Sequence, residues 1–223
     1  MELSKVRARE EIIAKFHDGQ IIAIGGQTGQ YMPERLIQCV LDSGARHLTI
    51  YSIDTSDPGT GVGRLIRAGV VDRIITTHVG TNPETNAQIQ AGTLRAEFSP
   101  MGSFIERIRC GGLGLGGVLT PVGIDTLVEE SPFCLGRQTI DGKDYLLMKP
   151  VHADFALLGA YKCDEFGNCW YKGTMRNFNV VMATAADTVI AECEYIVPVG
   201  EIEPENVHTY GMCVDYIVEG DRK

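Results

Sequence analysis

The sequence lacks most of the features that assign a chain at once to a common enzyme or membrane class. It contains no G-x-S-x-G of a serine hydrolase, no G-x-x-x-x-G-K-[ST] phosphate loop and no H-E-x-x-H zinc motif. No apolar run is long enough to cross a membrane. The charged N-terminus, residues 1–19, does not look like a secretory signal and predicts an amphipathic helix. We therefore expect a cytoplasmic protein with no membrane contact.

Positive charge and paired cysteines are also scarce. Lys and Arg number 20 against 29 Asp and Glu, and the net charge of −9 disfavours nucleic acid or an anionic membrane as a partner. The seven cysteines include no C-x-x-C pair, and their odd number favours reduced thiols over a disulfide framework. Cys163 and Cys169 have no His or further Cys at ligand spacing, so no metal site is expected.

What the chain does contain is an alternation of short apolar runs and amphipathic segments. With 223 residues, 44% of them hydrophobic, a single domain covering residues 1–223 is expected. The pattern predicts strands at 20–24, 47–52, 73–78 and 94–98, and helices at 33–43, 62–68, 84–91 and 103–110. Further strands are predicted at 145–148, 155–160, 189–192 and 215–218, with a hairpin turn at Asp141-Gly142. This order is typical of an α/β fold with an open, mostly parallel sheet flanked by helices.

Glycine is enriched, with 26 residues, and much of the excess lies in two loops. The first loop leaves a predicted strand and enters a predicted helix, which places it at the carboxyl end of the sheet, where α/β proteins bind ligands. Its glycines let backbone N–H groups converge, and the helix N-terminus adds a positive dipole end. A tight connection without a ligand is the equally open alternative. The loop residues are Gly25, Gly26, Gln27, Thr28, Gly29, Gln30 and Tyr31.

The second glycine loop, residues 111–117, contains a formal G-x-G-x-x-G at Gly112, Gly114 and Gly117. A dinucleotide fingerprint needs a strand before it and a helix after it. Here a helical segment precedes the loop and Thr120-Pro121 follows it, so a nicotinamide enzyme is disfavoured. We expect a flexible loop that forms part of a cleft wall.

Several isolated polar residues have both a functional and a structural interpretation. His78 ends a predicted strand and would face a cleft, although a packed or surface histidine is the commoner case. Glu129-Glu130 offers a catalytic carboxylate or a solvated turn. Arg107 and Arg109 would meet a phosphate or simply face water on an amphipathic helix.

Several motifs, in order along the chain, resemble those of family I CoA-transferase α subunits. The N-terminal signature is matched by Asp18-Gly19 through Gly25-Gly26, with Pro33 at its end. The resemblance continues nearly end to end, through residues 80–85, 106–112, 114–121, 153–157, 176–179 and 214–215.

The resemblance implies the open α/β CoA-transferase fold and an α₂β₂ heterotetramer. It implies transfer of CoA between an acyl-CoA and a short-chain carboxylate by a ping-pong route, with no metal. The covalent glutamate would lie on the β subunit, because no glutamate here has the family's Glu-Asn-Gly or Glu-Ser-Gly setting. Residues 25–31 would contact CoA. The acyl pocket would include Ile53, Asp54, Met101, Gly114, Gly116 and Gly117.

Four positions depart from the family pattern. Gln27 replaces a Phe and Tyr31 replaces a Gly, while Ile53 and Met101 replace an Asn and a Gln that enzymes of 3-oxo acids typically carry. Loss of such amides removes about 1–3 kcal/mol of discrimination for a carbonyl-bearing acid. We therefore predict an acyl specificity shifted away from acetoacetate.

Two other functions remain open on the same sheet. One is a different reaction, such as a sugar-phosphate isomerase or a CoA-ester hydrolase, which would be active from this chain alone. The other is a non-catalytic sensor that binds an acyl-CoA without turnover, even with a β-like partner present.

Overall fold

A parallel sheet forms the centre of the molecule in the computed structural model, which describes residues 4–221. Its strand order is β11-β10-β8-β1-β2-β3-β4, and β9 pairs with β8 as the antiparallel addition. The open, mostly parallel sheet predicted from the alternation is confirmed. The strands are β1 (Ile21–Ile24), β2 (Leu48–Tyr51), β3 (Val71–Thr76), β4 (Arg95–Phe98), β8 (Ala153–Asp164), β9 (Cys169–Trp170), β10 (Ala186–Val197) and β11 (Tyr216–Glu219).

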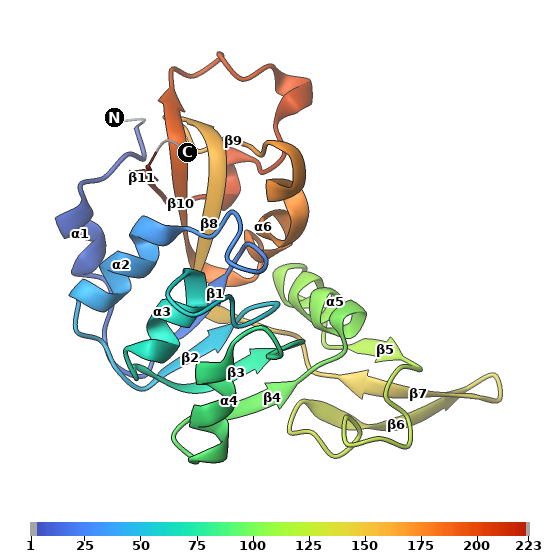
Figure 1. Ribbon diagram of the computed structural model, residues 1–223. Coiled ribbons are helices and arrows are strands. Elements are labelled where there is room, and N and C mark those ends of the chain that lie inside the picture. The colour runs from blue at the N-terminus through green and yellow to red at the C-terminus, as the bar shows by residue number, and fades with distance from the viewer. Residues whose placement is uncertain (1–3, 222–223) are drawn as a thin grey trace.

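Helices cover both faces of this sheet (Figure 1). One face carries α1 (Arg9–Ile13), α2 (Glu34–Asp42), α3 (Gly61–Arg67) and α4 (Pro83–Gln90). The other carries α5 (Met101–Gly112) and α6 (Arg176–Met182). Short 3₁₀ turns lie at Gly173–Met175, Pro204–Asn206 and Gly211–Cys213. Within residues 4–221, no helix combines the length and apolar character that a membrane span requires.

Strand β1 illustrates why the sheet needs helices on both sides. Ile22 and Ile24 point into the core under α2 and α3, whereas Ala23 points into the core under α5 and α6. All three side chains are fully buried. A strand buried on both faces reads as a continuous apolar run, which is the pattern of central parallel strands.

A second, smaller sheet projects from the main body (Figure 1). It is antiparallel, in the order β5-β7-β6, with β5 (Val118–Thr120), β6 (Cys134–Ile140) and β7 (Lys143–Met148). Asp141 and Gly142 form the predicted hairpin turn, both with positive φ as a type I′ turn requires. The inner face packs a small core of Phe133, Leu146 and Met148.

Two predictions for the ends of elements are wrong. The helix expected over residues 1–19 spans only Arg9–Ile13 within the described residues, and residues 1–3 lie outside them. Val6 pairs instead with Ile217 of β11, and Lys5 Nζ donates to two backbone carbonyls at 2.7 Å, which draws this segment onto the sheet edge. The second glycine loop begins later than predicted, because α5 continues to Gly112.

The seven cysteines carry free thiols, and five of them are buried. Cys163 and Cys169 face each other across the β8–β9 pair, with 3.3 Å between their sulfur atoms. Burial raises the pKa of Cys163 well above its usual range, so this thiol is held in its unreactive neutral form.

Candidate functional site

Four segments meet at the carboxyl edge of the sheet, because they follow the neighbouring strands β1, β2, β3 and β4. They are residues 25–31, 52–56, 77–82 and 99–101. Adjacent segments are joined by backbone and side-chain hydrogen bonds: Thr77 donates to Ile53 O through both N (3.1 Å) and Oγ1 (2.7 Å). Asn82 Nδ2 donates to Thr55 O at 3.1 Å. The result is a continuous polar rim in the position where open α/β sheets hold ligands.

The first glycine loop is a tight hairpin. Gln27 and Gln30 exchange two backbone hydrogen bonds of 3.1 and 2.7 Å across Thr28-Gly29. Thr28 and Tyr31 have φ values of 50° and 56°, in the left-handed region that β-branched and bulky residues rarely adopt. Such strain clusters at functional sites, where the surrounding structure imposes it. The side chains of Gln27 and Thr28 are exposed.

The carboxylate of Asp54 joins this loop to the segment after β2. Its Oδ2 accepts a hydrogen bond from Thr28 N at 2.6 Å, and its Oδ1 accepts one from Ser56 N at 2.8 Å. Asp54 is 3% exposed, and its backbone forms a bridge with His78 after β3. Asp54 therefore ties together three strand ends, the first two through its side chain and the third through its backbone.

Helix α6 packs against the first glycine loop through Asn179. The Oδ1 atom of this fully buried residue accepts from Gly159 N at 3.0 Å, and its Nδ2 donates to Met175 O at 2.9 Å. A Cβ atom on Gly25 would lie 2.0 Å from Asn179 Oδ1, and one on Gly159 would lie 2.3 Å from Tyr31 O. Both glycines are therefore required by close approach of the neighbouring groups.

The N-terminus of α2, expected to offer a free dipole end to an anion, is already occupied. Glu192 on β10 accepts hydrogen bonds from Arg35 N (2.8 Å) and Leu36 N (3.1 Å) through its Oε2 atom. Glu192 is 8% exposed. A buried carboxylate of the same chain therefore occupies the positive dipole end, which favours the alternative of a tight connection at this helix end.

Buried hydroxyl groups without a hydrogen-bond partner gather at the same edge. Among the described residues, seven buried side-chain atoms lack a partner, and six of them are hydroxyls on or beside the four segments. Such atoms are rare in native interiors, and they indicate a place where a water or a ligand completes the hydrogen bonding. The hydroxyls belong to Ser52, Thr55, Ser56, Thr85, Ser99 and Ser103.

Two buried charged groups, Glu97 and Arg107, lie behind the rim. Glu97 at the end of β4 receives Arg73 through two hydrogen bonds of 2.9 and 2.6 Å, and Arg95 through one ion pair of 3.1 Å. Arg107, expected to face phosphate or water, is 1% exposed, donates to Lys149 O at 2.8 Å and stacks over a phenylalanine ring at 4.1 Å. Burial lowers the pKa of Arg107. Glu97 therefore joins β4 to β3, and Arg107 joins α5 to the segment before β8.

The structure brings only part of the predicted acyl pocket together. Asp54 and Ile53 lie after β2, and Met101 begins α5 directly after β4, so the three share the carboxyl edge. Gly114, Gly116 and Gly117 follow the other end of α5. That helix has 12 residues and is about 18 Å long. Its last turn packs against Val151 and Thr184, which precede β8 and β10, at the amino edge of the sheet.

The remaining polar candidates have structural surroundings. His78 is exposed near the start of its segment, two residues after β3 ends. Glu129 lies in a turn under the small sheet and pairs with Arg137 at 2.8 Å, which lowers the pKa of its carboxyl group. Arg109 is exposed and pairs with Glu106 one turn earlier on α5. Of the three, only His78 lies at the carboxyl edge.

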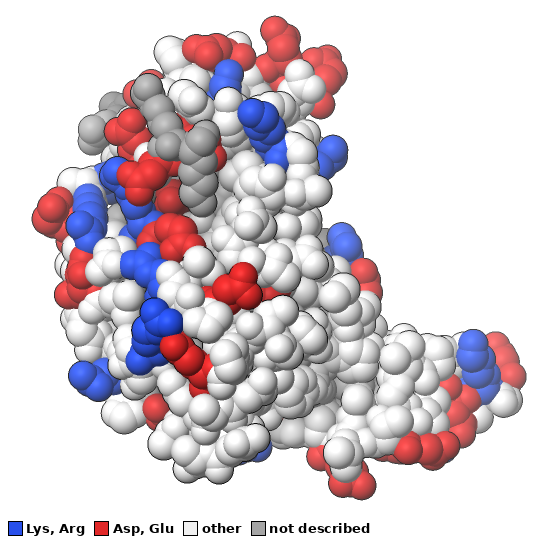
Figure 2. Space-filling view, viewed as in Figure 1, with Lys and Arg blue, Asp and Glu red and all other residues white. Residues whose placement is uncertain are grey.

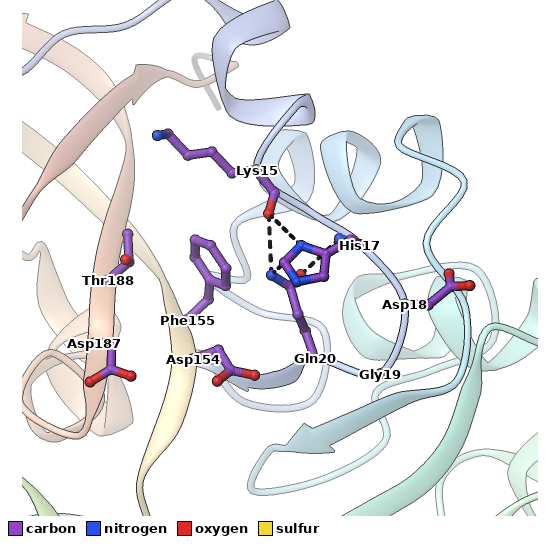
Figure 3. A pocket seen from close by; sticks show the side chains of 9 residues that line it. All are labelled: Lys15, His17, Asp18, Gly19, Gln20, Asp154, Phe155, Asp187 and Thr188. Atoms are coloured by element: carbon purple, nitrogen blue, oxygen red, sulfur yellow. Dashed lines mark hydrogen bonds between the residues drawn. The ribbon is translucent and has the colours of Figure 1, made fainter.

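An open pocket of about 490 Å³ lies at the opposite, amino edge (Figure 3). Its walls are the turn before β1 and the starts of β8 and β10. The polar groups there serve the fold: Asp154 Oδ2 accepts from Ile21 N at 2.7 Å, and Gln20 binds the backbone and ring of His17. Since parallel strands direct ligands to their carboxyl ends, this pocket is not the candidate site.

Charge is unevenly distributed over the surface. Figure 2 shows charged side chains over the flank of α1 and α2 and at the tip of the small sheet, with a broad face of few charges between them. Exposed leucines follow the end of α5 and continue onto the small sheet: Leu113, Leu115, Leu119 and Leu135.

Comparison with known proteins agrees with this geometry. The family model described as coenzyme A transferase matches residues 6–220. This chain belongs to the coenzyme A transferase family. It is 42% identical to the acetate CoA-transferase subunit alpha of Escherichia coli K12 over 217 residues, with 96% of each chain covered. It is equally identical, over 216 residues and 97% and 98% of the two chains, to the acetoacetyl-CoA:acetate/butyrate CoA transferase alpha subunit of Clostridium acetobutylicum.

A solved structure shares the fold of this CoA-transferase. The apoenzyme of the acyl-CoA transferase YdiF from Escherichia coli O157:H7 superposes with a TM-score of 0.87 at 20% identity. The match covers 99% of this chain but 48% of that one, so this chain spans about half the length of the YdiF polypeptide. The predicted family and fold are confirmed, and the protein is an enzyme of the CoA-transferase class, whose substrates are CoA thioesters.

Sequence reasoning missed three residues that shape the site. Asn82 caps α4 by accepting from Glu84 N and Thr85 N, and the Asn-Pro pair at 82–83 is a helix-start signal that would have found it. Glu192 and Asn179 act through contacts with residues far away in the sequence. Asn179 belongs to the matched motif at residues 176–179, but the motif does not indicate its contact with Gly159, and no local pattern distinguishes Glu192 from any other polar residue on a strand.

Proposed function

We propose that this chain is the α subunit of a two-subunit CoA-transferase, active in the cytoplasm as an α₂β₂ heterotetramer. The enzyme moves CoA between an acyl-CoA and a short-chain carboxylate. The covalent glutamate belongs to the β subunit, and this chain supplies the polar rim at the carboxyl edge, with residues 25–31 contacting CoA.

The proposed reaction has two symmetric halves. The β-subunit glutamate attacks the thioester carbonyl and expels CoA thiolate, which leaves an acyl-glutamyl anhydride. The thiolate then attacks the glutamyl carbonyl, releases the first carboxylate and forms a glutamyl-CoA thioester. A second carboxylate reverses the two steps and leaves as the new acyl-CoA. Backbone N–H groups and hydroxyls of this chain would stabilise the oxyanions on the way.

One observation carries the proposal: the site is rich in hydrogen-bond donors, while its buried carboxylates are engaged. Asp54 binds two backbone N–H groups, Glu192 caps α2, and Glu97 holds two arginines. A carboxylate held in this way is a poor nucleophile, because its lone pairs are already occupied. A nucleophile from another chain is the remaining source. The relatives named as alpha subunits support this division.

The test is co-expression with the neighbouring reading frame. We expect a stable complex that transfers CoA, and mass spectrometry of an acyl-CoA-treated complex should find CoA bound through a glutamate of the second chain. This chain alone should show no transfer. Hydrolysis of acyl-CoA by this chain alone would favour the hydrolase, and binding without turnover in the complex would favour the sensor.

Of the two positions where an amide is lost, we assign the proposed change of acyl specificity to Met101. Met101 is 49% exposed at the rim, whereas Ile53 is 1% exposed within the core under α5. We expect Met101→Gln to raise the ratio of kcat/KM for acetoacetate over acetate about tenfold, because the amide can bind the 3-oxo group. Steady-state kinetics of the complex measure this ratio.

A matched control is Met212→Gln, at a position 84% exposed and outside the four segments, which should leave the ratio unchanged. If wild type already prefers acetoacetate by a wide margin, the specificity proposal is wrong, even if the complex transfers CoA.

A further inference from the structure

The first glycine loop is held by a contact that its own sequence does not explain. Residues 27–30 close a hairpin with only two backbone hydrogen bonds, and Thr28 sits at a φ of 50°. A β-branched residue in the left-handed region costs about 1–2 kcal/mol. Something outside the loop must therefore stabilise this shape.

Asp54 is the group in the right position. Its two carboxylate oxygens accept from Thr28 N and Ser56 N at 2.6 and 2.8 Å, and both donors belong to residues with positive φ, 50° and 53°. Hydrogen bonds from a backbone N–H to an ionised carboxylate are among the stronger ones in proteins. We refer to this carboxylate and its two N–H donors as the Asp54 latch.

The latch leaves Asp54 little capacity to touch a substrate. The side chain is 3% exposed, and each oxygen already has a backbone donor. The segment around it is close-packed: a Cβ on Gly61 would lie 2.6 Å from Ser56 Oγ, and one on Gly29 would lie 2.5 Å from Thr60 Oγ1. The loop, the segment after β2 and the start of α3 thus interlock around one carboxylate.

We propose that Asp54 is a positioning residue that fixes the first glycine loop in the shape that receives acyl-CoA, and that it does not itself contact the substrate. The inference rests on the proposed function, because the loop is assigned there to CoA. If it is correct, loss of the Asp54 carboxylate changes the conformation of the first glycine loop while the rest of the chain stays folded.

The first measurement is kinetic and uses the complex with the β subunit. Asp54→Asn keeps the size of the side chain but turns one acceptor into an NH₂ group that opposes a backbone N–H. We expect kcat/KM for acyl-CoA to fall at least tenfold, with the complex still assembled. Asp57→Asn, an exposed neighbour in the same turn, should retain wild-type kinetics. Activity of Asp54→Asn within twofold of wild type would overturn the proposal.

A second variant separates positioning from a general loss of structure. Glycine reaches a φ of 50° without strain. Adding Thr28→Gly to Asp54→Asn should therefore raise kcat/KM at least threefold above the value for Asp54→Asn alone. No recovery would mean that the carboxylate acts in some other way than by holding Thr28.

The third measurement does not depend on activity. Amide hydrogen exchange of the isolated chain should be at least tenfold faster at Thr28 and Ser56 in Asp54→Asn than in Asp57→Asn, with β1 and β8 still protected. Unchanged exchange at Thr28 would show that the Asp54 carboxylate does not hold this N–H group, and it would overturn the proposal. A wild-type complex that transfers no CoA would instead overturn the proposed function. The exchange result would still show whether Asp54 holds the first glycine loop in shape.

Discussion

Glu192→Ala is expected to destabilise the chain by about 3–4 kcal/mol, although the residue lies on β10 and far from α2 in the sequence. Its carboxylate accepts from Arg35 N and Leu36 N, and removal leaves two N–H groups at the start of α2 unsatisfied, one partly buried and one buried. Each hydrogen bond to a charged group is worth about 1.5–3 kcal/mol, and the helix dipole adds to this at the N-terminus. Urea unfolding followed by circular dichroism measures the loss.

Two companion variants define the cause. Glu192→Gln keeps one acceptor oxygen without the charge and should lose about half as much stability. Glu130→Ala, at an exposed turn under the small sheet, should change stability by less than about 0.5 kcal/mol. Equal losses for the Ala and Gln variants would mean that the charge, and not the hydrogen bonding, holds α2.

The first half of the chain could be predicted closely because each of its elements carries its own signal. Strand β1 is a short, wholly apolar run, and α2 presents its buried side chains at helical spacing. The second half was predicted less completely. Strands β8 and β10 have 12 residues each, longer than the apolar runs at 155–160 and 189–192. They pair with each other over their whole length, and pairing over such a distance leaves no local pattern.

The site was predictable in its place but not in its contacts. A loop between a parallel strand and a helix must lie at the carboxyl edge, so the order of elements alone predicted the position of residues 25–31. Asp54 and Met101 were named from the family resemblance, and they lie at the same edge. The sequence could not indicate that Asp54 turns inward to Thr28, or that Glu192 fills the N-terminus of α2. Both depend on the register of strands that are distant in the sequence.

Those contacts change the physical picture of the loop. A glycine loop before a helix suggests an anion cradle made of backbone N–H groups. Here the Arg35, Leu36, Thr28 and Ser56 N–H groups are bound by carboxylates of the chain itself. These N–H groups already have partners within the chain. Under the proposed function, specificity would therefore depend on the groups that remain, such as the unpartnered hydroxyls and Met101.

Gly25→Ala tests how closely the first glycine loop packs against α6. We expect this substitution to lower the free energy of unfolding by about 3 kcal/mol. The new methyl group would lie 2.0 Å from Asn179 Oδ1 and 2.8 Å from Asn179 Cγ. Asn179 is fully buried and cannot yield without breaking its bonds to Gly159 and Met175. Overpacking typically costs 1–3 kcal/mol, and a lost buried hydrogen bond adds to it. Urea unfolding gives the stability, and the kinetics of the complex give kcat/KM, which should fall with it.

Gly102→Ala provides the matched control. Gly102 lies in the first turn of α5, has no atom within 4 Å of an added Cβ, and has an ordinary φ. Alanine is the better helix former, so this variant should be neutral or more stable by up to about 1 kcal/mol. Because both changes add the same methyl group near the same edge, the difference between them isolates the contact with Asn179. A Gly25→Ala protein as stable as the Gly102→Ala protein would mean that α6 moves away at little cost. The packing of α6 against the first glycine loop would then not be rigid.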